Sequence, residues 1–486
     1  MFNSPGKNNL YARVPTIRMY GKSVKVKKHI TYLGITLDPT LTWTQHIKHI
    51  AARTGLIFHT FAKYAKNKWG LNSEAMGTIY DHIFIPTITY ACGTWGQAAQ
   101  KVHPRRALTS AQRKALLLIT KAYRTAPNAS LQVMALKPPI EKVIDLYYKQ
   151  WNVKWGQNIN INPSYTINAN DLEKSTPFHL THYPGDLNPI KFNGNFNNNC
   201  KVFTDGSKVD NHVGCSFVVY RDEDEIFHKQ LRLADHCSVF QAELFAVNAA
   251  IHWCENNFSG LSINIVSDSQ ATIASIKNKH PHYLVTDIYC TIRHSTNEYF
   301  LNWTRAHQGN PGNERADELA KEAATDLTLT TSYNNMSNST LKHILWNNLL
   351  ENWQNDWNNN RQSITNNFFP HISDIYNYKW LKLNHSTSQF FTNHGNFHCY
   401  LNRFTNYSNN TCSLCGTQDG ALHYIFNCPM LDAERQHLKI IINSRGKDWP
   451  CSCNELINEH STYVYFNQLV NKYCKLAALN VSTSTS

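Results

Sequence analysis

The sequence predicts an α/β domain over residues 200–326, built on a mixed five-stranded sheet with flanking helices. After Cys200, short apolar runs typical of strands alternate with stretches whose apolar residues recur at helical spacing. With 486 residues, the chain is also too long for one hydrophobic core. We therefore expect a mainly helical region before this domain and a small segment rich in cysteine and histidine after it.

The expected elements of the α/β domain follow one another in the order β-β-β-α-β-α-(α)-β-α. The strands are expected at residues 202–204, 214–220, about 226–233, 262–266 and 300–303. The helices are expected at about 239–257, 270–277 and 313–325, and the first carries an apolar stripe from Phe240 to Cys254. Gly206-Ser207 is a turn signal, so we expect the first strand to end before it.

Four acids occupy strand ends or helix edges in this scheme: Asp205, Glu243, Asp268 and Asp317. Taken alone, Asp205 is more simply an ordinary turn residue before glycine. Taken together, four carboxylates brought close to one another would raise each other's pKa unless cations were bound. Two divalent ions about 3.5–4 Å apart would satisfy them and would clamp a phosphodiester for attack by water. Hard oxygen ligands favour magnesium, with manganese as an alternative.

A histidine lies on a Gly/Pro-rich loop shortly before the last acid, in the stretch His307-Gln-Gly-Asn-Pro-Gly. Histidine titrates near neutral pH, and a loop allows it to move relative to a site. An isolated loop histidine is most often exposed and without a role. The position of His307 just before Asp317 favours a functional one.

Four motifs occur here in a fixed order: Thr204-Asp205-Gly-Ser207, Gln241-Ala-Glu243-Leu244, Ser267-Asp268-Ser-Gln270 and His307-x-Gly309…Asn313-Glu-x-Ala-Asp317. This set resembles ribonuclease H of type 1, as found in retrotransposon polyproteins. The resemblance implies that the four acids bind two magnesium ions and that His307 assists turnover. Asp205 and Asp268 would hold the ion that activates water, and Glu243 would help hold the other.

The same resemblance implies cleavage of the RNA strand of an RNA–DNA hybrid, which leaves a 3′-hydroxyl and a 5′-phosphate. The 2′-hydroxyl marks the RNA strand, and an enzyme that reads groove shape needs no base contacts. Ser207, Gln270 and Asn313 are candidate contacts to these hydroxyls or to the minor groove.

Residues 1–150 are expected to form the basic, mainly helical region, with helices from Trp43 and over about residues 109–124. The net charge of +13 favours nucleic acid as a partner rather than a membrane. Residues 30–38, 41–46 and 88–95 resemble the segment after the polymerase palm in non-LTR retrotransposon reverse transcriptases, where thumb and connection grip the template-primer. That implies an association with the polymerase or endonuclease part of the same element. The Tyr-x-Asp-Asp signature of the polymerase is not in the sequence, so we do not expect polymerisation by this chain alone.

The remaining boundaries come from composition. Residues 151–199 are expected to be a linker, 327–405 an Asn-rich helical or linker region, and 436–486 a C-terminal tail. Residues 406–435 carry Cys412, Cys415, His423 and Cys428 at a spacing typical of a structural zinc site. Cys399, Cys451 and Cys453 are alternative ligands, although buried thiols are the simpler interpretation. The surrounding segment is similar to the C-terminal part of the same retrotransposon family, which implies a role in binding nucleic acid.

The 13 cysteines are scattered and odd in number, so we expect reduced thiols and a cytoplasmic or nuclear protein. Neither a secretory signal nor an apolar run of about 18 residues is found in the sequence. Two alternatives to an active ribonuclease H stay open: a catalytically inactive nucleic-acid-binding remnant, and a transposase-like nuclease that shares the sheet architecture. The position of Glu243 between the two strand-end aspartates disfavours the transposase-like nuclease.

Overall fold

The computed structural model describes residues 17–24, 27–66, 69–177, 189–192, 194, 200–305, 309–360, 362–405 and 408–483. The chain divides into two compact units. One unit comprises residues 1–151 together with 346–486, and the other comprises residues 152–345. In the described ranges, none of the helices has both the length and the apolar character needed to cross a membrane.

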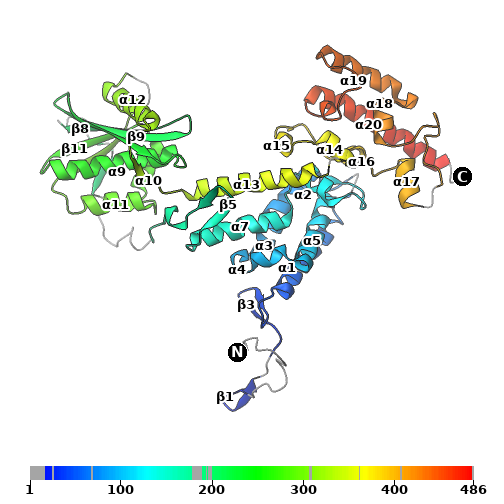
Figure 1. The fold of residues 1–486 in the computed structure, drawn as a ribbon, viewed down its shortest axis with the longest axis horizontal. Helices are drawn as coiled ribbons and strands as arrows, with labels where there is room; N and C mark the ends of the chain where they lie inside the picture. Colours follow the sequence, from blue (N-terminus) through cyan, green and yellow to red (C-terminus); the bar gives the residue numbers. More distant parts are fainter. Residues whose placement is uncertain are drawn as a thin grey trace. The chain divides into compact units, whose positions relative to one another are not determined.

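A seven-stranded mixed sheet forms the centre of the unit 152–345. Its strand order is β13-β10-β9-β8-β11-β12-β7. Figure 1 labels the three strands β8, β9 and β11. The strand bounds are Ile190–Phe192 (β7), Cys200–Val209 (β8), His212–Arg221 (β9), Asp224–Leu233 (β10), Ser262–Ser267 (β11), Glu298–Trp303 (β12) and Thr331–Tyr333 (β13). β9 runs antiparallel to its two neighbours β8 and β10, whereas β11, β12 and β7 continue the sheet from β8 in parallel. The five expected strands are thus present, and one short strand is added at each edge.

The helices of this unit cover both faces of the sheet. α9 (Val239–Asn257), α10 (Gln270–Lys277) and α11 (Tyr283–Ile292) lie on one face, and α12 (Pro311–Thr325) lies on the other (Figure 1). Ser238 and Gln241 form a capping box that fixes the start of α9. The larger apolar core packs beneath α9, and a smaller one beneath α12 includes Phe203 and Leu319. The sheet therefore has a buried core on each side.

The first strand is longer than the sequence predicts. Gly206 and Ser207 do not end it, because both continue to pair with β9, opposite Cys215 and Gly214. The turn lies instead at Asp210-Asn211, where both residues have positive φ angles of 47° and 70°. Such a pair is typical of a tight hairpin between twisted antiparallel strands. The prediction of a turn at Gly206-Ser207 is therefore wrong.

The stretch 151–199, which we expected to be a linker, contains regular structure. It includes the hairpin of β5 (Ile159–Asn162) and β6 (Tyr165–Ile167), and it ends in β7 of the large sheet. Nearby, the Glu173 carboxylate accepts hydrogen bonds from Gln241 (2.5 Å) and from the Tyr333 hydroxyl (2.6 Å). This segment thus packs against α9, the helix that carries Glu243.

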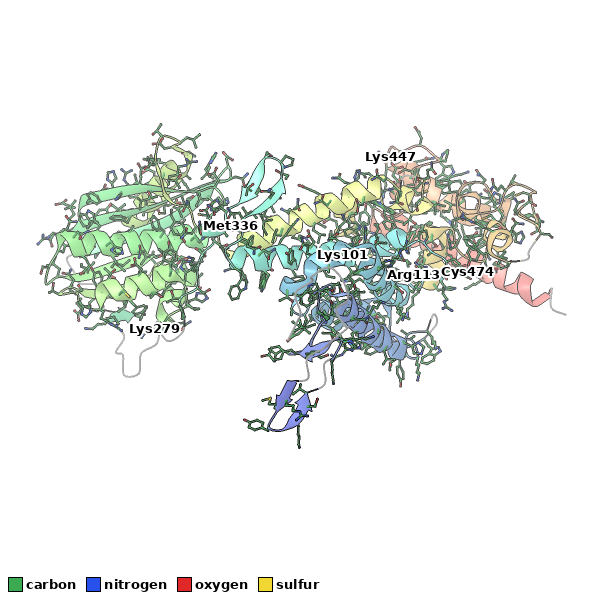
Figure 2. The ribbon with its side chains drawn as sticks, turned by 60° about the horizontal axis from the view of Figure 1, so that its bottom comes forward. Lys101, Arg113, Lys279, Met336, Lys447 and Cys474 are labelled. Carbon is green, nitrogen blue, oxygen red and sulfur yellow. The ribbon has the colours of Figure 1, made fainter. Side chains whose placement is uncertain are left out.

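The other unit is mainly helical. Its first half contains a small hairpin, β3 (Ile30–Tyr32) and β4 (Ile35–Leu37). The helices α1 (Thr44–Phe61), α5 (Val102–Thr120) and α7 (Ile140–Lys154) follow. Figure 2 labels Lys101, directly before α5, and Arg113 within it. α5 begins earlier than we expected. Pro104 does not prevent this start, because it falls in the first turn of the helix, where proline is tolerated.

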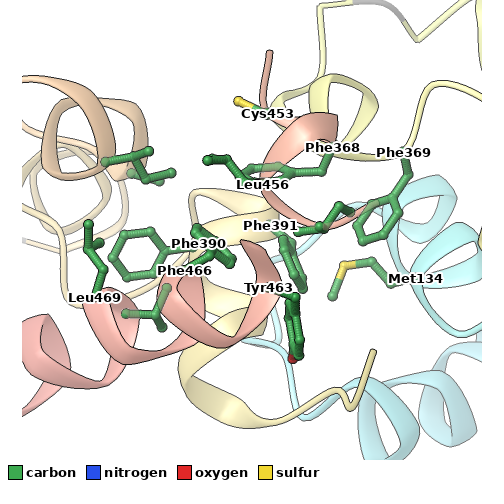
Figure 3. Close-up of a cluster of buried hydrophobic side chains, with 14 of the residues drawn as sticks. Met134, Phe368, Phe369, Phe390, Phe391, Cys453, Leu456, Tyr463, Phe466 and Leu469 are labelled. Atoms are coloured by element: carbon green, nitrogen blue, oxygen red, sulfur yellow. The ribbon is translucent and has the colours of Figure 1, made fainter. Parts of the chain in front are cut away.

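The second half of this unit adds the remaining helices. They include the end of α13 (Asn338–Asn358), α16 (His385–Thr392), α17 (His398–Phe404), α18 (Ala421–Phe426), α19 (Asp432–Ser444) and α20 (His460–Thr483). An aromatic-rich core joins these helices, with Phe368, Phe391 and Phe466 in contact (Figure 3). Residues of α20 such as Leu469 are fully buried in it. The described part of the expected tail, residues 436–483, therefore contributes to the core of this unit.

Candidate active site and candidate metal centre

Three of the four predicted acids converge in the unit 152–345. One carboxylate oxygen each of Asp205, Glu243 and Asp268 lies within 4.8 Å of the others. Asp205 and Glu243 are each only 6% exposed, and Asp268 is half-buried. The side chains come from β8, from α9 and from the residue directly after β11. A sheet and a covering helix therefore assemble an acidic site from distant parts of the sequence.

Strand register explains why the two aspartates meet. β8 and β11 are parallel neighbours, and their paired stretch ends at Thr204 opposite Ser267. Asp205 and Asp268 follow this pair, Asp205 within β8 and Asp268 directly after β11. Adjacent parallel strands lie about 4.8 Å apart, so residues that leave the ladder together remain close.

A glycine brings the third carboxylate to the same place. A Cβ atom on Gly206 would lie 2.5 Å from the backbone nitrogen of Glu243 and 2.8 Å from the carbonyl carbon of Ala242. No side chain fits there, so only glycine allows β8 and the first turn of α9 to approach this closely. The same contact places Glu243 beside Asp205.

α12 approaches the site from the other face of the sheet. The Ser216 hydroxyl donates to the carbonyl oxygen of Ala316 at 2.6 Å. A Cβ atom on Gly214 would collide with the backbone of Ala323 and Ala324, so the absence of a side chain at this position allows α12 to lie close to β9. This seating brings the amide of the buried Asn313 within 3.4 Å of the Asp268 carboxylate, to which it donates a hydrogen bond.

Asp317, the fourth predicted acid, lies on α12 outside the group of three. Its carboxylate forms an ion pair with Lys321 at 2.7 Å, one helical turn further on. Its negative charge nevertheless contributes to the raised pKa values of Asp205 and Glu243. The structure therefore brings three of the acids into direct proximity and leaves Asp317 beside them.

Burial and mutual repulsion dominate the electrostatics of the site. Desolvation, followed by the charges of Asp268 and Asp317, raises the pKa of Asp205 to about 7. Desolvation, followed by the charge of Asp205, raises the pKa of Glu243 to about 9. In both cases the backbone amide of Gly206 opposes the shift by hydrogen bonding. With these pKa values, a state in which both carboxyl groups are charged is unfavourable unless a positive charge lies beside them.

The donor set fits a hard divalent cation. Within the described residues, Oε2 of Glu243 is buried and has no hydrogen-bond partner, and the same holds for Oδ1 of Asn313. A buried oxygen without a partner is destabilising unless a cation or water binds it. Carboxylate oxygens are the ligands that magnesium prefers. Asp205, Glu243 and Asp268 would hold such an ion.

The other predicted site residues lie at different positions relative to the acids. Ser207 is half-buried on β8, two residues beyond Asp205 and hence on the same side of the strand. Gln270 is exposed at the start of α10, two residues after Asp268. Asn313 contacts Asp268, although we expected it to contact substrate. His307 lies outside the described residues.

Two residues near the site were missed by sequence reasoning. Trp303, at the end of β12, donates its indole N–H to the main-chain oxygen of Asp268 at 3.0 Å. Its position opposite Ser267 in the parallel ladder is a long-range feature that no local pattern reveals. Lys321 was detectable, because it stands four residues after Asp317 and this spacing favours ion pairs on a helix.

A second cluster with metal-binding potential lies in the mainly helical unit. One ligand atom each of Cys412, Cys415, His423 and Cys428 lies within 4.8 Å of the others. The Sγ atoms of Cys412 and Cys428 are 3.8 Å apart, and Sγ of Cys415 is 3.4 Å from Nε2 of His423. The predicted alternatives Cys399, Cys451 and Cys453 are not members of this cluster.

The local backbone explains how the first two cysteines converge. The amide of Cys412 donates to the carbonyl of Thr417, and the amide of Gly416 donates to the carbonyl of Cys412. Gly416 has a φ of +70°, so the tight turn favours glycine. Hydrogen bonds from Thr417 lower the pKa of the Cys415 thiol, which favours the thiolate form that binds metals.

The second half of the cluster is held by a buried arginine. The guanidinium of Arg435, 3% exposed, donates to the carbonyl oxygens of Ile425 (2.9 Å), Tyr424 (3.2 Å) and Cys428 (2.5 Å). These carbonyls lie at and just after the end of α18, where helical partners are missing. Arg435 therefore fixes the turn that carries Cys428. Three thiols and an imidazole at this separation fit a tetrahedral zinc ion.

Comparison with known proteins supports the assignment of the α/β domain. Residues 197–325 match the RNase H family. The chain is similar to a retrovirus-related Pol polyprotein from type-1 retrotransposable element R1 4 of Nasonia vitripennis, with 29% identity over 31% of this chain and 38% of that protein. It is also similar to a 115 kDa protein in type-1 retrotransposable element R1DM of Drosophila melanogaster, with 29% identity over 30% of this chain and 14% of that protein. The chain thus spans less than two fifths of the length of either relative.

Among solved structures, the chain is similar to RNase H1 from the halophilic archaeon Halobacterium salinarum. The two share 18% identity, and the match covers 26% of this chain and 96% of that protein with a TM-score of 0.23. Together with the matches to Pol polyproteins, the RNase H family match confirms the resemblance to non-LTR retrotransposon polyproteins that the sequence motifs indicated. The expected ribonuclease H-like fold is confirmed by the same family match and by the strand order of the sheet.

Proposed function

Because the chain contains an RNase H domain over residues 197–325, we propose that it cleaves the RNA strand of RNA–DNA hybrids and leaves a 3′-hydroxyl and a 5′-phosphate. The observation that carries this proposal is the convergence of Asp205, Glu243 and Asp268 within 4.8 Å. The raised pKa values of Asp205 and Glu243 support a site built for cations, since bound divalent ions would stabilise both carboxylates in their charged form.

Each of the site residues is assigned a role in this reaction. Asp205 and Asp268 would hold one magnesium ion, and Glu243 would help hold a second, with Asp317 as a further acid. When bound, two such ions supply the activation of water and the stabilisation of the leaving oxygen in an in-line displacement. Asn313 orients Asp268 through its 3.4 Å hydrogen bond, and Lys321 partly neutralises Asp317. We assign His307 the role of assisting turnover, as the motif resemblance implies.

Substrate recognition is assigned to polar groups beside the acids. Ser207 stands on the same side of β8 as Asp205, and Gln270 is exposed two residues after Asp268. Both side chains donate and accept hydrogen bonds, as contacts to ribose hydroxyls require. This arrangement supports recognition of the groove and the 2′-hydroxyl rather than of base sequence.

The decisive experiment compares the wild-type chain with Asp205→Asn on a labelled RNA–DNA hybrid in magnesium. We expect the wild type to cut the RNA strand and Asp205→Asn to lose at least about 10³-fold in rate, because a neutral amide is a poor ligand for magnesium. Asp222→Asn removes an acid from the exposed β9–β10 turn and is the matched control.

The outcomes separate the three candidate functions. Binding of hybrid without any cleavage by the wild type would favour an inactive nucleic-acid-binding remnant. Cleavage of duplex DNA in preference to hybrid would favour a transposase-like nuclease. Unchanged cleavage by Asp205→Asn would refute the metal-binding role of this residue.

We further propose that the cluster of Cys412, Cys415, His423 and Cys428 binds one structural zinc ion. Four protein ligands close the coordination shell, which is typical of a structural rather than a catalytic site. The burial of Cys412 and Cys428 within the aromatic-rich core supports this role, because the ion would link the first turn of the segment to α18. The net charge of +13 supports nucleic acid as a partner of the chain as a whole.

A further inference from the structure

A cavity of about 700 Å³ lies in the mainly helical unit, and none of its lining residues belongs to either cluster described above. It is lined on one side by α5 and on the other by the C-terminal end of α13 and the residues that follow. Its volume is within the range of sites that bind small molecules or single nucleotides. Nothing in the proposed nuclease chemistry uses it.

One face of α5 supplies polar groups to this cavity at helical spacing. Five residues that recur every three to four positions line it: Arg105, Arg106, Thr109, Ser110 and Arg113. Such spacing places side chains in one row along a helix. Three guanidinium groups and two hydroxyl groups therefore face one cavity, and all five side chains are hydrogen-bond donors.

Two of the arginines are held in fixed positions. Arg105 donates through Nε and Nη2 to one carboxylate oxygen of Glu141, at 3.1 and 2.9 Å. Arg113 donates through Nη1 to the side-chain oxygen of Asn128 and through Nη2 to the carbonyl oxygen of Arg124, both at 2.5 Å. A guanidinium has five N–H donors, so each arginine retains donors for a ligand. Their positions are set before any ligand arrives.

The charge in the cavity is not balanced internally. Asp356, one of the two acids in the lining, is paired with Lys142 at 2.9 Å, and Glu141 is paired with Arg105. Arg113 is half-buried and has only neutral oxygen partners among the described residues. Arg106 is exposed and forms no side-chain hydrogen bond or ion pair within the described ranges. A half-buried positive charge without a counter-charge favours an anion as ligand.

From this arrangement we infer that the cavity binds a phosphate group of a single nucleic-acid strand, with Arg106 and Arg113 as its principal contacts. Arginine is suited to this task because its planar fork matches two phosphate oxygens at once. Thr109 and Ser110 would donate to the remaining oxygens. The cavity has room for one nucleotide unit around that phosphate, so a free nucleotide is the alternative source of the same chemistry.

The test measures binding of a labelled single-stranded DNA of mixed sequence to the full chain by fluorescence anisotropy, without magnesium. We expect Arg106→Ala to weaken binding about tenfold and to reduce the slope of log affinity against log salt by about one. Lys101→Ala is the matched control, since Lys101 is an exposed cation directly before α5 (Figure 2) and does not line the cavity. It should change affinity less than twofold.

The affinity of Arg113→Lys for the same strand is a second, independent test. This substitution keeps the positive charge but removes the planar fork, so a fivefold or greater loss of affinity supports two-point contact with phosphate. Thermal unfolding of both variants checks that the unit stays folded, because Arg113 also holds Asn128. Equal binding by wild type, Arg106→Ala and Arg113→Lys would overturn the proposal.

Adenosine monophosphate, added as competitor, identifies the source of the phosphate. Displacement of the strand at micromolar mononucleotide, lost in Arg106→Ala, assigns the cavity to free nucleotides. Binding of the strand that resists such competition but is weakened by Arg106→Ala assigns it to a nucleic-acid backbone. Both outcomes support a phosphate site and do not depend on ribonuclease activity, which Asp205→Asn tests separately.

Discussion

Gly206 and Glu243 are in backbone contact: a Cβ atom on the glycine would stand 2.5 Å from the amide nitrogen of the glutamate. We predict that Gly206→Ala forces β8 and α9 apart and destabilises the domain by about 1–3 kcal/mol, as overpacked cores do. Cleavage should fall more than stability alone explains, because Glu243 is displaced from Asp205. Urea unfolding and hybrid cleavage measured on the same preparation separate the two effects.

Gly77→Ala is the control for this substitution. Gly77 lies within the helix α2 (Ser73–Ile79), and a Cβ atom there would meet nothing within 4 Å. Alanine is a better helix former than glycine, so this variant should be slightly more stable and should cleave normally. If Gly206→Ala behaved like Gly77→Ala, the close contact would not position Glu243.

The raised pKa values of Asp205 and Glu243 predict an unusual pH dependence of stability without metal. Their folded-state values of about 7 and about 9 exceed those of an unfolded chain, so the folded state binds more protons between pH 4 and 9. Stability must therefore fall as pH rises through this window. One pKa unit corresponds to about 1.4 kcal/mol, so the change amounts to several kcal/mol.

The measurement is the urea midpoint from pH 5 to pH 9, after dialysis against magnesium-free buffer. Dialysis is preferable to a chelator, which would also strip zinc from the cysteine cluster. Addition of magnesium should raise the midpoint most at high pH, because the carboxylates must lose protons to bind it. The double variant Asp205→Asn plus Glu243→Gln should lose most of the pH slope. A stability that rises toward pH 9 in the magnesium-free wild type would contradict the raised values.

Local sequence patterns predicted the centre of the α/β domain well. The helix expected at about 239–257 has these bounds, because a capping box at Ser238 and a continuous apolar stripe both act within the helix itself. The length of β8 could not be predicted, since Gly206 and Ser207 remain in the strand only through pairing with β9. The edge strands β7 and β13 are three residues each and form through long-range pairing.

The candidate site was predictable to a similar extent. Asp205, Glu243 and Asp268 follow from residue type and from their positions next to strands and on a helix edge. The contact between Asn313 and Asp268 depends on how α12 is seated on the sheet through Ser216 and Ala316. That seating is a tertiary feature, so sequence reasoning had no means of finding it.

Asn313 and Gln270 should therefore affect different steps of cleavage. Asn313→Ala removes the hydrogen bond to Asp268, and we predict a 10- to 100-fold loss of activity, which is typical when a residue that orients a metal ligand is lost. The magnesium concentration needed for half-maximal rate should rise. Gln270 is exposed, and Gln270→Ala should mainly raise KM for hybrid. A magnesium titration of initial rates at several hybrid concentrations distinguishes the two.

Ser207→Ala completes this comparison. It removes only a hydroxyl beside Asp205 and should resemble Gln270→Ala, with the magnesium requirement unchanged. If Asn313→Ala also raised KM alone, Asn313 would contact substrate, and its hydrogen bond to Asp268 would be incidental.

The cysteine cluster predicts that zinc stabilises the core of the mainly helical unit. Cys412 and Cys428 are almost completely buried and pack with Tyr424, whose hydroxyl also donates to the buried Asp419 at 3.0 Å. We predict about one zinc per chain by elemental analysis. Cys412→Ser plus Cys415→Ser should abolish zinc binding and destabilise this unit by several kcal/mol, because structural zinc contributes directly to folding.

Limited proteolysis provides the readout, since loss of the ion should expose α18 and the residues before it to cleavage. Cys290→Ser is the matched control, because Cys290 is exposed on α11 and lies outside the cluster. It should retain zinc and resist protease like the wild type. Hybrid cleavage by the double variant tests the independence of the two metal centres: the acidic site contains no zinc ligand, so its initial rate should stay within about twofold of the wild type at 25 °C. Full zinc content in the double variant would show that these cysteines are not the ligands.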